Sequence, residues 1–207
     1  MGKYKIFGHD GKISAMTSNL AAHAKSELRK KILQARKARE FNAELSTAFN
    51  VHLAELCLET GASRIACYLP FGNEPDVELF LDWALENNIE ILLPVANKDG
   101  TMHWVIFDGA TKQGVLGFTE ADGQVSKPEQ VDLAIIPALA VSKTGIRLGR
   151  GKGYYDKALP QFDPLPPVVA VLFEDELLEE IASEPHDHNV DAVITPAGIT
   201  RFNERLK

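Results

Sequence analysis

Residues 131–139 of this 207-residue chain, VDLAIIPAL, decide its predicted fold. A largely apolar run of this length is typical of a strand that is buried on both faces, as in a parallel sheet covered by helices. Residues 145–156, GIRLGRGKGYYD, follow closely and contain four glycines, three cations, two tyrosines and one aspartate. Because ligands of parallel sheets bind beyond the carboxyl ends of the strands, this second segment is the predicted binding loop.

The rest of the chain alternates between helix and strand patterns. Helices are predicted at residues 20–39, 45–56 (before a C-terminal glycine, Gly61), 77–88, 156–159 and 174–182. Strands are predicted at residues 64–68, 89–96, 131–139, 168–173 and 192–195. Residues 102–107 are expected to be the hairpin partner of 89–96, and residues 108–130 a long connection. This alternation predicts an α/β fold with three layers, α/β/α, around a mainly parallel, Rossmann-like sheet.

The composition limits the classes of function. The chain has 29 acidic and 22 basic residues and a net charge of −7, which argues against a general nucleic-acid binder. No apolar run approaches the roughly 18 residues of a membrane span, and no signal peptide is visible, so a cytoplasmic protein is expected. Cys57 and Cys67 are expected to be buried apolar residues. Residues 19–207 are predicted to form one domain, and the polar residues 1–18 a tail or an added extension.

The binding loop matches neither of the two common phosphate-binding motifs. Gly151-Lys152 lacks the Ser or Thr that would follow in a P-loop, and the glycine spacing is not that of a Rossmann fingerprint. A flexible surface turn is the alternative, but it does not explain paired tyrosines between glycine and aspartate. A phosphate cradle is preferred, in which backbone N–H groups with Arg147, Arg150 and Lys152 neutralise a polyphosphate. Asp156 would then bind magnesium.

Residues 136–159 resemble the 5-formyltetrahydrofolate cyclo-ligase family, also called methenyltetrahydrofolate synthetases. The hallmark of that family is a strand ending in proline, then Arg-Leu-Gly-x-Gly-x-Gly-Tyr-Tyr-Asp, which residues 147–156 match completely. The resemblance implies that ATP is bound by Arg147, Leu148, Gly149, Arg150, Gly151, Lys152, Gly153, Tyr154 and Tyr155. It implies that the folate is contacted by Arg150, Gly151, Lys152, Gly153 and Tyr154, although which tyrosine faces the folate stays open. Arg147, Arg150 and Lys152 are the expected catalytic cations.

Two upstream segments follow the order of the family. Lys25-Ser-Glu-Leu-Arg29 resembles its Lys-x-x-x-Arg motif, which contacts ATP, and the four-residue spacing puts both cations on one helix face. Residues 68–76, YLPFGNEPD, resemble the strand end that contacts the folate. This resemblance implies that Leu69 and Glu74 bind the substrate. Asp76 is also explained as a helix N-cap.

A downstream segment, residues 186–191 (HDHNVD), resembles the His-Asp segment before the last strand of the family. The first aspartate there helps to hold magnesium, which implies the same role for Asp187. The His-x-His spacing also suggests a transition-metal site, but no third soft ligand is in view and carboxylates suit magnesium better. The chain departs from the family at Val141-Ser142, where Phe-Asp is frequent; this departure affects the pocket wall and not the nucleotide loop.

The resemblance implies an ATP- and magnesium-dependent enzyme that converts 5-formyltetrahydrofolate to 5,10-methenyltetrahydrofolate with release of ADP and phosphate. These small molecules are the expected partners, with neither nucleic acid nor membrane, and a monomer is expected because no exposed apolar stripe is obvious. Two alternatives stay open: a sugar-phosphate isomerase on a similar scaffold, and a non-catalytic relative that binds nucleotide or folate. The cations Lys25 and Arg29 favour the ligase over the isomerase, and the acidic pair Asp156 and Asp187 favours it over the binder.

Overall fold

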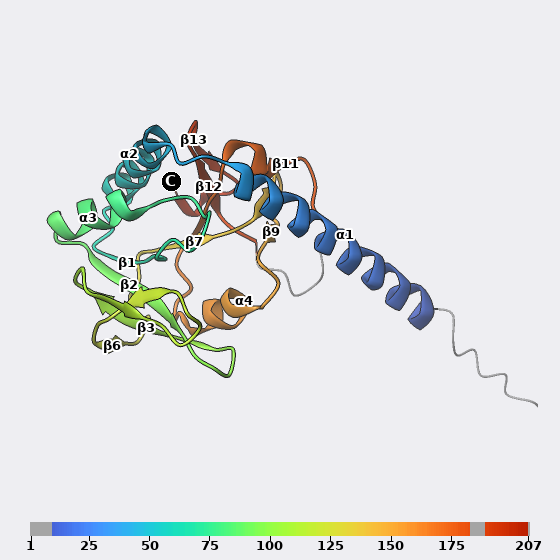
Figure 1. The fold of residues 1–207 in the computed structure, drawn as a ribbon, viewed down its shortest axis with the longest axis horizontal. Coiled ribbons are helices and arrows are strands. Elements are labelled where there is room, and N and C mark those ends of the chain that lie inside the picture. Colours follow the sequence, from blue (N-terminus) through green and yellow to red (C-terminus); the bar gives the residue numbers. More distant parts are fainter. Residues whose placement is uncertain (1–9, 183–188, 207) are drawn as a thin grey trace, which may run out of the picture.

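The structure, a computed structural model, describes residues 10–182 and 189–206, with side chains from residue 20 onward. Its α-helices are α1 (Asp10–Ala38), α2 (Ala43–Thr60), α3 (Glu78–Glu86) and α4 (Tyr154–Ala158) (Figure 1). The strands are β1 (Arg64–Ala66), β2 (Glu90–Ala96), β3 (Met102–Phe107), β4 (Thr111–Gln113), β5 (Thr119–Ala121), β6 (Val125–Ser126), β7 (Leu133–Pro137), β8 (Ala140–Ser142), β9 (Arg147–Leu148), β10 (Val168–Val171), β11 (Leu177–Leu178), β12 (Ala192–Thr195) and β13 (Gly198–Arg201). Short 3-10 helices lie at Leu159–Gln161, Glu174–Glu176 and Glu204–Leu206.

An eight-stranded sheet forms the centre of the described part of the chain, in the order β13-β12-β10-β7-β1-β2-β3-β6. The strands from β12 to β2 are parallel, while β13, β3 and β6 add in antiparallel fashion at the two edges. The apolar run quoted at the start contains β7, which pairs with β10 on one side and β1 on the other. The prediction of a mainly parallel sheet is therefore confirmed.

Helices cover both faces of this sheet, so the predicted three-layer arrangement is also confirmed. Side chains alternate between the faces along each strand. Leu133 and Ile135 of β7 pack into the core beneath α2 and α3, whereas Ala134 and Ile136 pack into the core beneath α4. Figure 1 shows α2 and α3 together on one side of the strands and α4 on the other. Because both faces of β7 are covered, the strand has almost no polar side chain.

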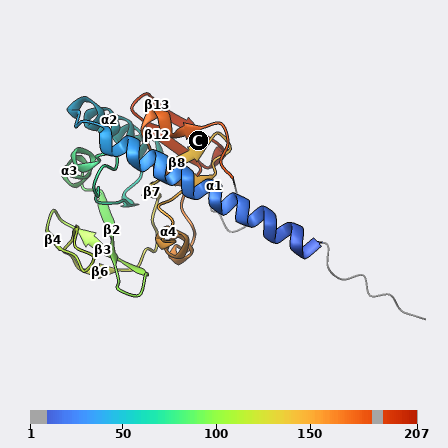
Figure 2. The same cartoon turned by 45° about the vertical axis from the view of Figure 1, so that its right-hand side comes forward.

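Helix α1 packs against a second, smaller sheet. This sheet has the order β11-β8-β9. Ile32 of α1 packs with Leu139, Ala140, Leu148 and Ile181 in a separate apolar cluster. The N-terminal part of α1 projects away from the rest of the molecule (Figures 1 and 2). Only the C-terminal half of α1 is therefore held by the fold, and that half carries the two cations predicted to contact ATP.

The chain order creates a topological switch point between β1 and β7, the position at which open α/β sheets form a crevice. After β1 the chain continues through α3 to β2 on one side, and it later returns to β7 on the other side of β1. Helix α3 lies over one face of the sheet and α4 over the opposite face. The loops that leave the carboxyl ends of β1 and β7 therefore diverge, and ligands of open α/β sheets bind at such switch points. These two loops contain Leu69 and Glu74, and Arg147 to Asp156.

Three predicted elements are wrong. The connection at 108–130 contains a hairpin, β4 with β5, followed by β6. The helix predicted at 174–182 is a 3-10 turn followed by β11, because the carboxylate of Glu176 turns inward to a buried guanidinium and to the Phe173 N–H. The strand at 192–195 is not the last, since β13 pairs with it. In addition, α1 begins at Asp10, upstream of the predicted helix start.

Several local predictions are confirmed. Gly61 ends α2 with a φ of 65°. Cys57 and Cys67 are free and buried. Asp76 accepts a hydrogen bond from the Glu78 N–H at 2.9 Å, although the N-cap position of α3 is taken by Val77 and not by Asp76. Among the described helices, none combines the length and apolar character required to cross a membrane.

Candidate active site

Arg147, the first residue of the candidate site, belongs to strand β9 and not to a flexible loop. It pairs with Val141 across the β8–β9 hairpin, and its side chain is buried, with 8% of the residue exposed. The guanidinium forms an ion pair with Asp156 in the first turn of α4. Its Nε is buried and has no hydrogen-bond partner among the described residues. A buried N–H group without an acceptor lowers the stability of the fold. Arg147 Nε is therefore positioned to donate a hydrogen bond to an oxygen of a bound ligand.

Two glycines of the loop let guanidinium groups approach the backbone. A Cβ at Gly149 would lie 2.9 Å from Nη1 of Arg147. A Cβ at Gly151 would lie 3.3 Å from Cζ of Arg29, and the Gly151 φ of +88° also favours glycine. Arg29 in turn donates from Nε to the Gly149 carbonyl at 2.9 Å. The structure therefore brings Arg29 of α1 onto the glycine loop.

Lys25 lies on the same face of α1 as Arg29 and is only 4% exposed. The buried stripe continues through Ile32 to Arg36, at intervals of three or four residues. Arg36 binds both oxygens of Glu176 at 2.7 Å and donates to the Ala138 carbonyl at the end of β7. The cationic face of α1 is therefore fixed against the carboxyl ends of the strands.

Glu74 faces the glycine loop from the loop after β1. Its Oε1 accepts a hydrogen bond from Arg150 Nε at 2.8 Å, and its Oε2 accepts one from the Phe71 N–H at 3.1 Å. Arg150 also lies 5.4 Å from the Phe71 ring centroid, and Phe71 contacts the ring of Phe118 at 4.5 Å. Glu74 is thus joined to Arg150 across the crevice, beside a pair of aromatic rings.

Two tyrosines adjoin Glu74: Tyr68, which is buried, and Tyr155, which is partly buried. Burial, and after it the negative charge of Glu74, raises the pKa of Tyr155 well above its usual value. The same two causes raise the pKa of Tyr68, whose hydroxyl donates to the Pro75 carbonyl at 2.8 Å. Both phenols therefore stay protonated at neutral pH. Tyr155 also stands 5.9 Å, ring centroid to Cζ, from Arg147, which places it between the two ion pairs of the site.

The other predicted residues lie around these groups. Lys152 is exposed, and Gly153 precedes α4 with a φ of 68°. Tyr154 packs beside Tyr155 at the edge of the core beneath α4, and Leu69 packs against the opposite core. Arg147 and Leu148 belong to β9, so the prediction that they form part of an irregular loop is corrected. The predicted metal ligand Asp187 and the His-x-His segment lie outside the described residues.

The charges suit an anionic ligand with a bound divalent cation. The described residues contain no group of three or more His, Cys, Asp or Glu side chains that could hold a metal by themselves. Asp156, with 42% of its side chain exposed, is a single carboxylate beside the cationic loop. Magnesium usually binds through one or two carboxylates together with substrate phosphates and water. Asp156 fits that use and does not fit a site made of protein ligands alone.

The sequence prediction missed three groups that shape the site. Phe118 was assigned to a connection, yet the β4–β5 hairpin carries it to Phe71. No role was predicted for Arg36 on the basic face of the first helix, yet its side chain is buried, with 1% of the residue exposed. Asn73 donates from Nδ2 to the Arg36 carbonyl at 2.8 Å and so fixes the loop that carries Glu74. The spacing of Arg36 from Lys25 and Arg29, at eleven and seven positions, was the available signal.

Comparison with known proteins agrees with this geometry. The sequence profile of the 5-formyltetrahydrofolate cyclo-ligase family matches residues 21–196. The chain is 34% identical over 195 residues to the 5-formyltetrahydrofolate cyclo-ligase of Mycolicibacterium smegmatis, covering 86% of this chain and 96% of the relative. The solved 5,10-methenyltetrahydrofolate synthetase of Aquifex aeolicus is similar with a TM-score of 0.75 and 28% identity, covering 87% of this chain and 93% of that one. The Mycoplasma pneumoniae synthetase structure gives 0.67 and 28%, covering 82% and 97%.

Proposed function

Because the chain belongs to the 5-formyltetrahydrofolate cyclo-ligase family, we propose that it converts 5-formyltetrahydrofolate and ATP to 5,10-methenyltetrahydrofolate, ADP and phosphate. One observation in particular supports this: Arg147 with Asp156, and Arg150 with Glu74, meet at the crevice between β1 and β7. The Arg147–Asp156 pair lies within the segment that contains the glycine loop. The Arg150–Glu74 pair joins that loop to the predicted folate segment. A site for two substrates requires such a junction.

The reaction explains why ATP is consumed. The formyl oxygen of the substrate is a poor leaving group. Transfer of the γ-phosphoryl group to that oxygen converts it into a phosphate, which leaves readily. The N10 amine then attacks the formyl carbon and loses its proton, the C–O bond breaks, and the five-membered ring closes. The enzyme must therefore hold the formyl oxygen in line with the γ-phosphate and N10 close to the formyl carbon.

In this proposal, cations of the glycine loop and of α1 bind the phosphates of ATP during phosphoryl transfer. Arg147, Arg150 and Lys152 neutralise the charge that is spread over the transferred group. Lys25 and Arg29 contact the phosphates from α1. The backbone from Leu148 to Tyr155 completes the nucleotide site. Magnesium, when bound with the nucleotide, would neutralise further phosphate charge, and Asp156 and Asp187 are the carboxylates proposed to hold it.

The folate is proposed to lie against the loop after β1. Glu74 accepts hydrogen bonds from pterin N–H groups, and Leu69 contacts the ring. Tyr155 is a candidate for the tyrosine that faces the folate, because its hydroxyl is buried and within electrostatic reach of Glu74. Tyr154 and the backbone of Gly151 and Gly153 line the same junction.

A single assay tests the proposal. The purified chain is mixed with 5-formyltetrahydrofolate and Mg-ATP, and the ultraviolet absorbance of methenyltetrahydrofolate is followed, with ATP omitted as a control. Product that forms only with ATP supports the ligase. Folate or nucleotide binding without product would show the non-catalytic relative, and ATP-independent turnover of a sugar phosphate would show the isomerase.

Variants then test the assignments. Arg147→Ala and Asp156→Ala are expected to lower ATP-dependent turnover by orders of magnitude, and near-normal activity in both would contradict the nucleotide site. Glu74→Ala is expected to raise the KM for folate more than the KM for ATP. His186→Ala is expected to retain activity if magnesium, and not a transition metal, is used.

Three broader expectations accompany the proposal. We infer that residues 19–207 form one domain, which the family match over residues 21–196 supports. The enzyme is proposed to act as a monomer in the cytoplasm on small molecules, without nucleic acid or membrane. Light scattering of the purified chain and fractionation of cells that express it are the direct measurements.

A further inference from the structure

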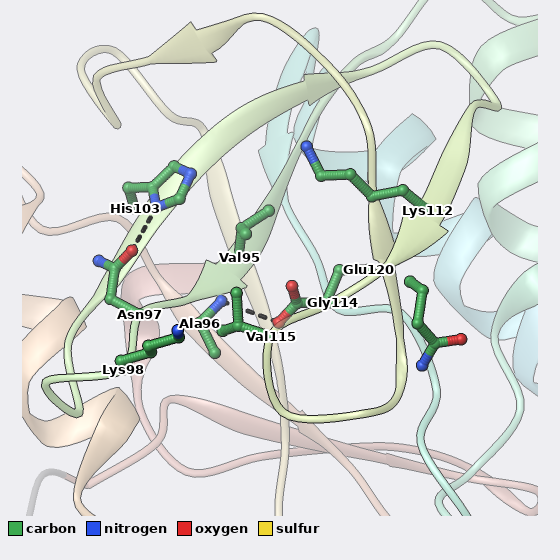
Figure 3. A pocket seen from close by; sticks show the side chains of 10 residues that line it. Val95, Ala96, Asn97, Lys98, His103, Lys112, Gly114, Val115 and Glu120 are labelled. Carbon is green, nitrogen blue, oxygen red and sulfur yellow. Dashed lines mark hydrogen bonds between the residues drawn. The ribbon is translucent and has the colours of Figure 1, made fainter.

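A hollow of about 340 Å³ lies beyond the carboxyl end of β2 (Figure 3). Its walls come from the β2–β3 turn and from the β4–β5 hairpin, which meet around Ala96, Lys98, His103 and Glu120. Its volume is within the range of about 300–1,000 Å³ that small-molecule sites occupy. No role proposed above uses this hollow.

One wall of the hollow is attached to the candidate folate segment, and the other to α4. On the hairpin, Phe118 contacts Phe71 next to Glu74, and Glu120 follows two residues later. On the other wall, Lys157 of α4 donates from Nζ to the Gly100 carbonyl in the β2–β3 turn at 3.2 Å. Through Phe118, the hairpin wall therefore joins the hollow to the loop that carries Glu74.

Glu120 supplies a buried carboxylate inside the hollow. The residue is 4% exposed, and its Oε1 accepts a hydrogen bond from the Ala96 N–H at 3.0 Å. Among the described residues this is its one hydrogen bond, so Oε2 is left to accept from a ligand. Gly114 makes room for the carboxylate, since a Cβ there would lie 2.2 Å from Oε2. Figure 3 shows Glu120 and Gly114 side by side. The hollow therefore offers a carboxylate oxygen to a ligand that carries an N–H or O–H donor.

The rim of the hollow is cationic. Lys98 has no ion-pair partner within the described residues, whereas Lys112 is held by Asp122 at 2.7 Å. His103 is fixed by Asn97, whose Nδ2 donates to Thr101 and whose Oδ1 therefore accepts from His103 Nδ1 at 3.0 Å. A ligand for this rim carries negative charge in addition to the N–H group.

We propose that the hollow binds the glutamate tail of 5-formyltetrahydrofolate, with the amide N–H of the tail donated to Glu120 and a tail carboxylate held by Lys98. The tail is a benzoyl amide of glutamate, so it combines one N–H donor with two carboxylates. This inference rests on the proposed function, because it extends the same folate site. It assigns tail recognition to the β4–β5 hairpin.

Two substrates test the assignment: 5-formyltetrahydrofolate, and 5-formyltetrahydropteroate, which retains N10 but lacks the glutamate. At saturating Mg-ATP, kcat/KM is expected to be about tenfold higher for the first, as for one hydrogen bond to a charged group together with an ion pair. Glu120→Gln keeps an acceptor for Ala96 and is expected to remove most of this preference. Lys98→Ala is expected to reduce it about threefold, with Lys98→Arg restoring it. Glu120→Gln and Lys98→Ala should each leave turnover of the pteroate unchanged, because the pteroate lacks the glutamate.

A matched control and a binding measurement separate this inference from the proposed function. Lys127→Ala removes an exposed lysine away from the hollow and should leave the preference unchanged. Calorimetry with p-aminobenzoylglutamate measures tail binding without turnover, and Glu120→Gln should weaken it. Absence of turnover with either substrate would refute the proposed function alone. An unchanged affinity for p-aminobenzoylglutamate in Glu120→Gln and Lys98→Ala, or an unchanged substrate preference, would refute the tail site alone.

Discussion

Arg150 is predicted to couple the two substrates, because it pairs with Glu74, the proposed folate residue, while belonging to the proposed nucleotide loop. ATP phosphates would compete for the guanidinium and release the Glu74 carboxylate to accept pterin N–H groups. Nucleotide binding should therefore strengthen folate binding. Arg150→Gln removes the charge while keeping a side chain of similar length, so it should remove the coupling without removing Glu74.

The structure sets the size of this effect. Arg150 Nε lies 2.8 Å from Glu74 Oε1, with 36% of the Arg150 side chain and 8% of the Glu74 side chain exposed. Exposed pairs contribute about 0.2–1 kcal/mol, and breaking a fully buried pair costs about 3–5 kcal/mol. A pair with one buried partner should fall between these limits. A coupling of about 1–2 kcal/mol corresponds to about 5–30-fold in affinity.

Calorimetry measures this coupling directly. 5-Formyltetrahydrofolate is titrated into the protein with and without a saturating, non-hydrolysable ATP analogue. The analogue should tighten folate binding by about 5–30-fold in the natural sequence and by less than about twofold in Arg150→Gln. Thermodynamic linkage requires the same factor when the analogue is titrated with and without folate.

Lys152→Gln is the matched control for Arg150→Gln. Lys152 lies two residues away in the same loop, is exposed, and has no ion pair among the described residues. Its replacement removes the same charge and should weaken binding of the analogue while leaving the coupling factor unchanged. If Arg150→Gln kept the full coupling factor, or if Lys152→Gln lost it, the competition for Arg150 would be the wrong explanation.

Three further predictions concern stability and are checked by urea unfolding. Gly123→Ala should lower the unfolding free energy by about 1–3 kcal/mol, because the new Cβ would lie 2.0 Å from the Ile106 carbonyl oxygen. Arg36→Met should cost about 3–5 kcal/mol, since it leaves the buried carboxylate of Glu176 unpaired; replacing both partners by apolar residues should cost less. Burial raises the pKa of the Cys57 thiol to about 12, so the folded chain keeps a proton that the unfolded chain loses above about pH 9. Stability from this group is present at neutral pH and should fall by about 2 kcal/mol between pH 8 and 10.5. Burial raises the pKa of the Cys67 thiol as well, so Cys57→Ala should reduce the total loss over this range by about 2 kcal/mol without abolishing it.

The sequence predicted the fold where a single physical signal dominated. The apolar run at 131–139 could only be a covered strand, and it contains the central strand β7. The segment at 174–182 was misjudged because local helix propensity was opposed by a tertiary contact, the burial of the Glu176 carboxylate against Arg36. The β4–β5 hairpin was missed because its strands are short, and β4 is exposed along its whole length.

The sequence predicted which residues form the candidate site, but not which of these residues contact one another. Arg29 and the glycine loop are separated by 120 positions, and Arg150 and Glu74 by 76, so no local pattern could show that they meet. The sequence also assigned Arg147 and Asp156 separate partners, phosphate and magnesium. In the structure these two side chains bind each other, which is the simplest way to bury a guanidinium before a ligand arrives.

The two ion pairs of the glycine loop have a consequence for the dependence of nucleotide binding on ionic strength. Two of the three cations in the glycine loop are already neutralised by carboxylates of the same chain, so the loop attracts fewer counterions than its sequence suggests. Nucleotide entry then exchanges carboxylate for phosphate and displaces few ions from solution. Added salt screens the competing carboxylates together with the phosphates. Affinity for ATP should consequently fall less steeply with salt than for a loop whose three cations face solvent alone.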